Sequence, residues 1–159
     1  MRLFYLDASA WVKRYFHEAG STWVNQQFEH GSLMGASTLG LIEVTATCAR
    51  KRTAGAIDAA RFQQIEIDLL DDWNGLFQVG LSPEVVHRSL DVARTHALRG
   101  ADCAQLAAAM AFREQLALGA VEFALVASDQ ELNAAAVKAG LIVVDPQVEE
   151  AKRSSHPTP

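Results

Sequence analysis

Short apolar runs alternate with longer stretches of helical spacing along most of the chain, and this alternation limits the folds open to it. The runs of strand length are Leu3–Leu6, Leu33–Ala36, Leu76–Val79, Phe123–Ala127 and Leu141–Val144. Because each run is continuously apolar, it is typical of a parallel strand whose two faces are both covered. The pattern predicts an α/β fold, a three-layer α/β/α sandwich around a parallel five-stranded sheet.

The segments between these runs carry apolar residues three and four positions apart, which is typical of amphipathic helices. The spacing is carried by Phe62, Ile65, Leu69 and Trp73, by Val86, Leu90, Ala93 and Ala97, and by Cys103, Leu106, Ala107 and Met110. A first helix is expected from Ala10 to Phe16. The 159 residues fit one domain, placed at residues 1–147, and the polar remainder, 148–159, is expected to be a disordered tail.

Composition excludes several classes of protein. No apolar stretch approaches the ~20 residues that span a bilayer, and Asp7 interrupts the N-terminal apolar run, so we expect a cytoplasmic protein without a membrane partner. The net charge of −5 argues against a protein that coats nucleic acid by charge alone. Cys48 and Cys103 stand far apart in apolar contexts, which favours free, buried thiols.

Four acidic residues stand where the predicted elements would bring them together. Asp7 and Asp129 follow apolar runs, and the carboxyl ends of parallel strands form one edge of a sheet, where ligands bind in open α/β folds. Glu43 lies within one predicted helix and Asp102 opens another. Each also has a purely structural explanation: a helix cap for Asp7, a capping box of Ser128 and Glu131 beside Asp129, a capping pair of Asp102 with Gln105, and a solvated helix face for Glu43.

Clustered carboxylates repel one another, and a hard divalent cation relieves that repulsion. Because no cysteine or histidine cluster competes, Mg²⁺ or Mn²⁺ fits such a site best. A cation of this kind activates water and neutralises charge on a phosphoryl group, so phosphodiester hydrolysis is the expected reaction class.

The surroundings of the four acids resemble a known family. Leu6-Asp7-Ala8-Ser9, Ser37-Thr38-Leu39 with Glu43, the segment 98–107 around Asp102 and the segment 127–132 around Asp129 are similar, in order, to the motif blocks of PIN domains, and of the VapC toxins of bacterial toxin–antitoxin pairs in particular. The likeness runs from Leu3 to about Val144.

That resemblance implies an endoribonuclease that uses Mg²⁺ or Mn²⁺ to cut RNA by water attack. Asp7, Glu43, Asp102 and Asp129 would be its catalytic, metal-binding acids. Ser9 would hydrogen-bond to Asp7 or to a water in the site, and Ser128 is a weaker candidate for the same supporting role. The resemblance also implies a cognate antitoxin as partner and a homodimer.

Basic residues near the acids are candidates for contact with RNA phosphates. They are Lys13, Arg14, Arg50 and Arg99. For Arg50 the alternative is a favourable position at the C-terminal end of its helix, where cations complement the helix dipole.

Other acid-cluster folds fit less well. A phosphoacceptor receiver domain normally has paired acids after its first strand, where this chain has Asp7 alone. A phosphatase with an aspartate nucleophile needs a second aspartate where Ser9 stands. A PIN-like module that binds RNA or a protein without cutting, and a nuclease that cuts DNA, stay open as alternatives.

Overall fold

A computed structural model of the chain describes residues 2–116 and 122–155. Within these residues it contains a five-stranded, entirely parallel sheet with the strand order β3-β2-β1-β4-β5. The strands are β1 Arg2–Leu6, β2 Leu33–Ser37, β3 Phe77–Val79, β4 Glu122–Val126 and β5 Ile142–Val144. The helices are α1 Ala8–Trp11, the 3₁₀ turn η1 Val12–Arg14, α2 Ser21–Glu29, α3 Thr38–Thr53, α4 Ala59–Gly75, α5 Pro83–His96, α6 Gly100–Gln115, α7 Gln130–Lys138 and α8 Pro146–Ser154. The predicted fold class and all five predicted strands are confirmed, with ends that differ by a residue or so.

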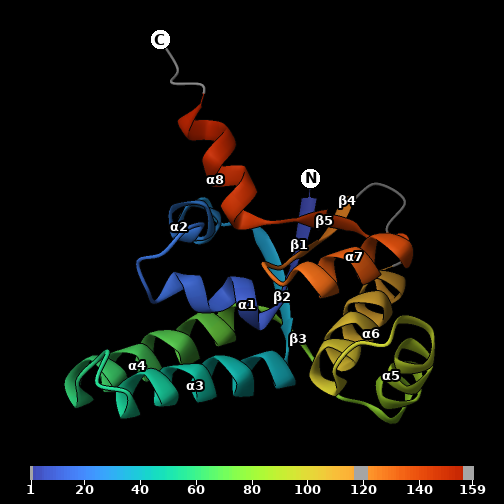
Figure 1. The fold of residues 1–159 in the computed structure, drawn as a ribbon, viewed down its shortest axis with the longest axis horizontal. Helices are drawn as coiled ribbons and strands as arrows, with labels where there is room; N and C mark the ends of the chain where they lie inside the picture. Colours follow the sequence, from blue (N-terminus) through green and yellow to red (C-terminus); the bar gives the residue numbers. More distant parts are fainter. Residues whose placement is uncertain (1, 117–121, 156–159) are drawn as a thin grey trace.

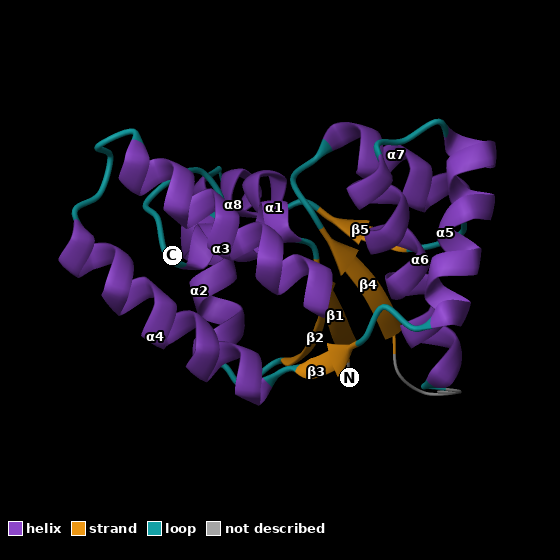
Figure 2. Ribbon diagram, turned by 90° about the horizontal axis from the view of Figure 1, so that it is seen from below, coloured by secondary structure: helices purple, strands orange, loops and turns teal. Residues whose placement is uncertain are grey.

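Helices cover both faces of the sheet, so alternate residues of each inner strand enter two different cores (Figure 1). On β1, Leu3 and Tyr5 pack beneath α5, α6 and α7, whereas Phe4 and Leu6 pack on the side of α1 to α4. Figure 2 shows the two groups of helices on opposite sides of the strands. Burial on both faces explains why the strands are continuously apolar in the sequence.

The topological switch point of the sheet, where successive strands change from one side of β1 to the other, lies between β1 and β4. The chain proceeds from β1 through β2 to β3 on one side, and β4 and β5 then lie on the other side of β1. The crevice between the carboxyl ends of β1 and β4 is therefore the place where an open α/β sheet binds ligands. The backbone N–H of Asp7 donates to the carbonyl of Val126 at 3.0 Å and fixes these two strand ends together.

Two predicted helices differ from the observed ones. The first helix begins at Ala8, not at Ala10, and ends in a 3₁₀ turn, because Asp7 caps it through the N–H of Ser9. On α5 the predicted apolar stripe faces away from the core: Val86 is 48% and Leu90 47% exposed. The buried side of α5 carries Val85 and Val92 instead.

The predicted disordered tail is wrong for most of its length. Pro146–Ser154 forms α8, with Asp145 as its N-terminal cap and Pro146 in the first turn, and it packs against α2. Gly20 makes this contact possible, because a Cβ there would lie 2.9 Å from Pro146 Cβ. Gly20 also has a φ of 90°, a backbone conformation that residues with a Cβ rarely adopt. Residues 156–159, the end of the predicted tail, lie outside the described part of the chain.

Cys48 and Cys103 are both buried free thiols, as predicted. None of the helices in the described residues is long and apolar enough to cross a membrane.

Candidate metal and nuclease site

The four predicted acids are carried by four separate elements around the carboxyl ends of β1 and β4. Asp7 follows β1, Asp129 follows β4 by three residues, Glu43 lies in the second turn of α3, and Asp102 lies in the first turn of α6. Asp7 is buried, with 5% exposure, and the other three are partly buried. Their oxygens form the donor set that Mg²⁺ and Mn²⁺ prefer.

Asp7 is held by hydrogen bonds that all reach one of its oxygens. Ser9 donates to Asp7 Oδ2 from its backbone N–H at 2.9 Å and from its hydroxyl at 2.5 Å. The Ser9 hydroxyl in turn accepts from the backbone N–H of Ser128 at 2.9 Å. Ser9 therefore links the ends of β1 and β4, and it leaves Asp7 Oδ1 without a hydrogen-bond donor among the described residues.

The charge on Asp7 is poorly compensated. Burial raises the pKa of its carboxyl to about 6 against the partial compensation from Ser9, and the negative charges of Glu43 and Asp102 raise that pKa further. A carboxylate with this environment is one that a cation would stabilise.

Asp102 and Asp129 share one cation of the protein itself. The guanidinium of Arg99 lies 3.2 Å from Asp102 Oδ2 and 3.3 Å from Asp129 Oδ2. Asp102 does not pair with Gln105 as a cap. Asp129 does serve as the cap of α7, since its Oδ1 accepts from Leu132 N–H at 2.9 Å, so the predicted cap exists but belongs to Asp129 and not to Ser128.

Glu43 is held from the neighbouring helix. Its Oε2 accepts a hydrogen bond from Gln105 Nε2 at 2.6 Å. Sequence spacing assigned Gln105 to Asp102 and thus missed this contact; a polar residue among Cys103, Leu106 and Ala107 on the apolar side of α6 was the available signal.

The four acids have the donor atoms that suit a divalent cation, but their side chains are not arranged as a complete coordination site. Among the residues that the structure describes, no three carboxylate, histidine or cysteine groups lie close enough together to hold a metal as they stand. Arg99 lies between two of the acids and pairs with one oxygen of each, Asp102 Oδ2 and Asp129 Oδ2. The arrangement is one of acids gathered at one edge, partly neutralised by an arginine.

The four predicted RNA contacts have different surroundings. Lys13 is buried and pairs with Glu18 at 3.2 Å, surroundings that do not favour contact with a substrate. Arg14 is partly buried against Asp72 and the ring of Phe28. Arg50 is exposed and donates to Thr47, two turns along α3 from Glu43. Arg99 is 75% exposed at the acids themselves.

Ser128 supports the site mainly through its backbone. Its N–H donates to Ser9, whereas its hydroxyl lies 3.4 Å from Asp145 Oδ1 and turns towards the cap of α8. The direct hydroxyl contact to the acids comes from Ser9 alone of the two serines.

Comparison with known proteins identifies the family, although no family model matches the chain. The chain is 32% identical over 149 residues to ribonuclease VapC45 of Mycobacterium tuberculosis (strain CDC 1551 / Oshkosh), a match that covers 94% of this chain and 99% of the relative.

Solved structures show the same fold at lower identity. PAE2754 from Pyrobaculum aerophilum superposes with a TM-score of 0.67 at 15% identity, covering 98% of this chain and 91% of that one. A toxin–antitoxin complex from Klebsiella pneumoniae superposes with a TM-score of 0.60 at 16% identity, covering 92% of this chain and 98% of that one. With near-complete coverage of a relative at 32% identity and with the PIN-like sheet, the chain belongs to the VapC ribonuclease family.

Proposed function

We propose that the protein is a Mg²⁺- or Mn²⁺-dependent endoribonuclease that hydrolyses RNA phosphodiester bonds and acts as the toxin of a toxin–antitoxin pair. The observation that carries this proposal is the group of four acids at the switch point of the sheet. Asp7 there has a raised pKa because of burial and neighbouring charge, and Asp102 and Asp129 are bridged by Arg99. The relationship to ribonuclease VapC45 supports RNA as the substrate.

Asp7, Glu43, Asp102 and Asp129 would hold the cation, which would supply activation of the attacking water and neutralisation of charge on the phosphate. Ser9 keeps Asp7 in one orientation by donating to Oδ2. Arg99 and Arg50 are exposed cations on the α6 and α3 sides of the acids and would bind the flanking phosphates, which position a nucleic acid without reading its sequence.

Cleavage of an end-labelled, partly single-stranded RNA with Mg²⁺, Mn²⁺ or a chelator tests the proposal. We expect cutting only with metal and loss of cutting, with the fold retained, in Asp7→Asn and Asp102→Asn. Asp58→Asn is the matched control, because Asp58 also caps a helix but opens α4, an element that carries none of the four acids. Near-wild-type cutting by Asp7→Asn or Asp102→Asn would rule out the four-acid site.

The same assay separates the alternatives. Metal-dependent binding of RNA without turnover would favour a non-cutting module, and equal or faster cutting of a single-stranded DNA of the same sequence would favour a deoxyribonuclease. Contamination is excluded when the cutting activity disappears in Asp102→Asn purified in parallel.

We further propose a cognate antitoxin and a homodimer as partners; similarity to a toxin–antitoxin complex supports the first. An apolar groove between α3 and α4 fits a partner segment, with Leu41 and Leu69 in its lining and with Ile42 62% and Leu70 54% exposed at its sides. Ile42→Glu should weaken capture of an antitoxin encoded by the adjacent reading frame, whereas Ile142→Glu, at the edge strand β5, should not. Light scattering of the chain alone tests the dimer.

A further inference from the structure

Gln105 is an unusual residue for its position. It lies on the buried side of α6 with only 1% exposure, surrounded in the sequence by apolar and small residues. A buried amide without partners costs about 1–3 kcal/mol, so its retention there depends on its hydrogen bonds. Its side-chain amide makes three hydrogen bonds, two at the carbonyl oxygen and one from the NH₂ group, and the last of these reaches an acid of the candidate site.

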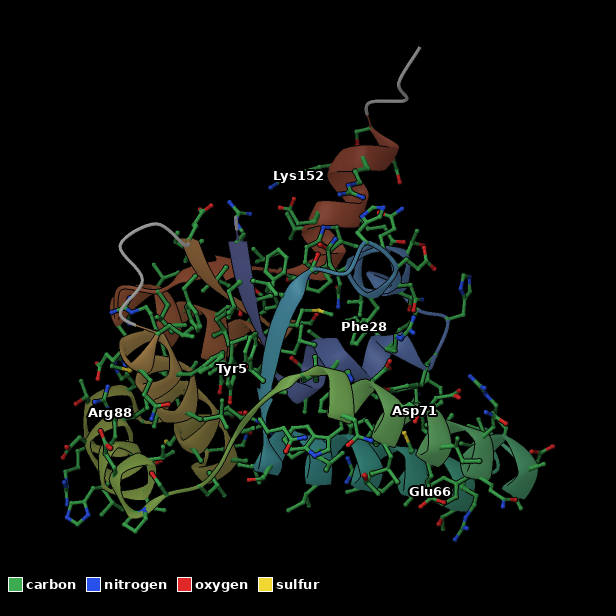
Figure 3. The ribbon with its side chains drawn as sticks, turned by 180° about the vertical axis from the view of Figure 1, so that it is seen from behind. Tyr5, Phe28, Glu66, Asp71, Arg88 and Lys152 are labelled. Carbon is green, nitrogen blue, oxygen red and sulfur yellow. The ribbon has the colours of Figure 1, made fainter. Side chains whose placement is uncertain are left out.

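The carbonyl oxygen of Gln105 accepts two hydrogen bonds. Tyr5 Oη, from β1, and Ser37 Oγ, from the end of β2, each lie 2.9 Å from Gln105 Oε1. Burial raises the pKa of the Tyr5 hydroxyl well above its usual range, so the phenol is neutral and has a proton to donate. Figure 3 shows Tyr5 in the interior of the molecule. Its ring centroid lies 6.4 Å from that of Phe112 on α6, with the two rings tilted by 53°.

The direction of the Ser37 bond is fixed by the start of α3. Ser37 caps this helix, and its hydroxyl oxygen accepts from the Gly40 N–H at 2.9 Å. The hydroxyl proton is thereby free to point at Gln105. Two donors at Oε1 oblige the other end of the amide, the NH₂ group, to point the opposite way.

The opposite direction leads to Glu43. Gln105 Nε2 donates to Glu43 Oε2 at 2.6 Å, the short distance of a charge-assisted hydrogen bond. Gly40 leaves room for this approach, because a Cβ at that position would lie 3.3 Å from Gln105 Nε2. These hydrogen bonds thus connect β1 and β2, through the buried side chain of Gln105 on α6, with an acid on α3.

We propose that Gln105 is the positioning residue for Glu43, holding one carboxylate oxygen so that the acid is already ordered when the cation binds. The proposal rests on the metal-dependent site of the preceding section. Because Gln105 is buried, it touches neither RNA nor solvent, and its effect passes through Glu43. Restriction of the Glu43 side chain before binding lowers the entropy cost of forming the site, and groups that orient metal ligands typically change metal affinity about 10–100-fold.

Gln105→Met tests this, because methionine has a similar length and no amide. We expect Mn²⁺ binding, measured by calorimetry without RNA, to weaken about 10-fold or more. In the cleavage assay, kcat should fall while the KM for RNA changes less than about twofold, since no substrate contact is removed. Mn²⁺ affinity within twofold of wild type in a folded Gln105→Met would overturn the proposal.

Destabilisation alone must be separated from loss of positioning. Tyr15→Phe removes another buried phenol hydrogen bond, the 2.7 Å bond to Asp72, and should leave Mn²⁺ affinity unchanged. If Gln105→Met fails to fold because Tyr5 is left without an acceptor, Tyr5→Phe with Gln105→Met removes that orphan hydroxyl and carries the same expectation.

A double-mutant cycle tests whether Gln105 affects Mn²⁺ affinity through Glu43. In a Glu43→Gln background, Gln105→Met should have no further effect on Mn²⁺ affinity, whereas an undiminished second loss would overturn the proposed route. Failure of the proposed ribonuclease function would be distinguishable from failure of the proposed role of Gln105. If the wild-type protein neither binds Mn²⁺ nor cuts RNA with it, both proposals are wrong. Wild type that does both, with an unaffected Gln105→Met, would remove only the role of Gln105.

Discussion

Arg99 lies 3.3 Å from Asp129 across 30 residues of sequence, and the same guanidinium lies 3.2 Å from Asp102. One exposed arginine thus joins two of the four acids, from the start of α6 to the start of α7. On the proposed function, a divalent cation would be attracted to the same carboxylates and would therefore compete with this guanidinium.

Removal of this guanidinium should strengthen metal binding. Because Arg99 is exposed, solvent and salt screen both of its ion pairs, so Arg99→Gln should raise Mn²⁺ affinity only modestly, about two- to tenfold, in calorimetry at low salt. Arg94→Gln is the matched control, since Arg94 is exposed on α5 and pairs with Asp91. Unchanged or weaker Mn²⁺ binding by Arg99→Gln would show that the guanidinium does not compete.

The buried carboxyl of Asp7 should make stability fall as pH rises. Its folded pKa of about 6 lies above the ordinary 3.8, so the folded state holds the proton more tightly. The contribution of this carboxyl to the free energy of unfolding is present in full below about pH 4 and is lost as pH rises through 6. The loss amounts to about 3 kcal/mol.

Asp7→Asn keeps an oxygen that accepts from Ser9 but has no charge to bury. Denaturant unfolding in a chelator should therefore show the variant gaining on wild type by up to about 3 kcal/mol between pH 4 and pH 8. Parallel stability curves for the two proteins across this range would contradict the raised pKa.

The end of α5 is held in a conformation that favours glycine. Ala97, its C-terminal cap, has a φ of 52° and is the one non-glycine residue with positive φ among those described. Ala97→Gly should stabilise the protein by about 0.5–1 kcal/mol, after allowance for the greater freedom of glycine in the unfolded chain. The midpoint temperature of thermal unfolding should rise by a few degrees. Ala93→Gly, exposed inside the same helix, should lower stability by about 1 kcal/mol; a gain in both would refute the argument from φ.

Gly35 on β2 is required by the packing of α6 on the sheet. A Cβ there would lie 2.6 Å from Phe112 Cε1 and 3.0 Å from the Phe77 carbonyl. Gly35→Ala should therefore cost about 1–3 kcal/mol through overpacking, measured by denaturant unfolding. Gly75→Ala, with no atom within 4 Å of the added Cβ, should be neutral or slightly stabilising. Partial rescue by Phe112→Leu would identify the ring as the source of strain.

Local patterns were sufficient for the architecture. The strand at Leu3–Leu6 and its four counterparts were predictable because burial on both faces leaves an uninterrupted apolar run, which is visible without knowledge of neighbours. The positions of Asp7 and Asp129 at one edge followed from parallel strands, since that geometry places all carboxyl ends together.

Partners across the fold were not predictable in the same way. Gln105 has capping distance from Asp102 in the sequence, yet the turn of α6 directs it into the core, towards Tyr5 and Glu43. Lys13 looked like a phosphate contact, but the 3₁₀ turn at the end of the first helix buries it beside Glu18. Both sets of contacts depend on how each helix is rotated within the fold, which the spacing of residues along a helix does not specify.

The sequence by itself determined the class of fold, the order of its elements and the four acids, because apolar periodicity and strand-end positions are properties of short segments. Tertiary structure decided which atoms those acids meet: Ser9 and a buried environment for Asp7, Gln105 for Glu43, and Arg99 for Asp102 and Asp129. It also decided that Val85 and not Val86 faces the core, and that the chain beyond Pro146 is a helix. These outcomes depend on how helices rotate and pack against a twisted sheet, which only the assembled chain fixes.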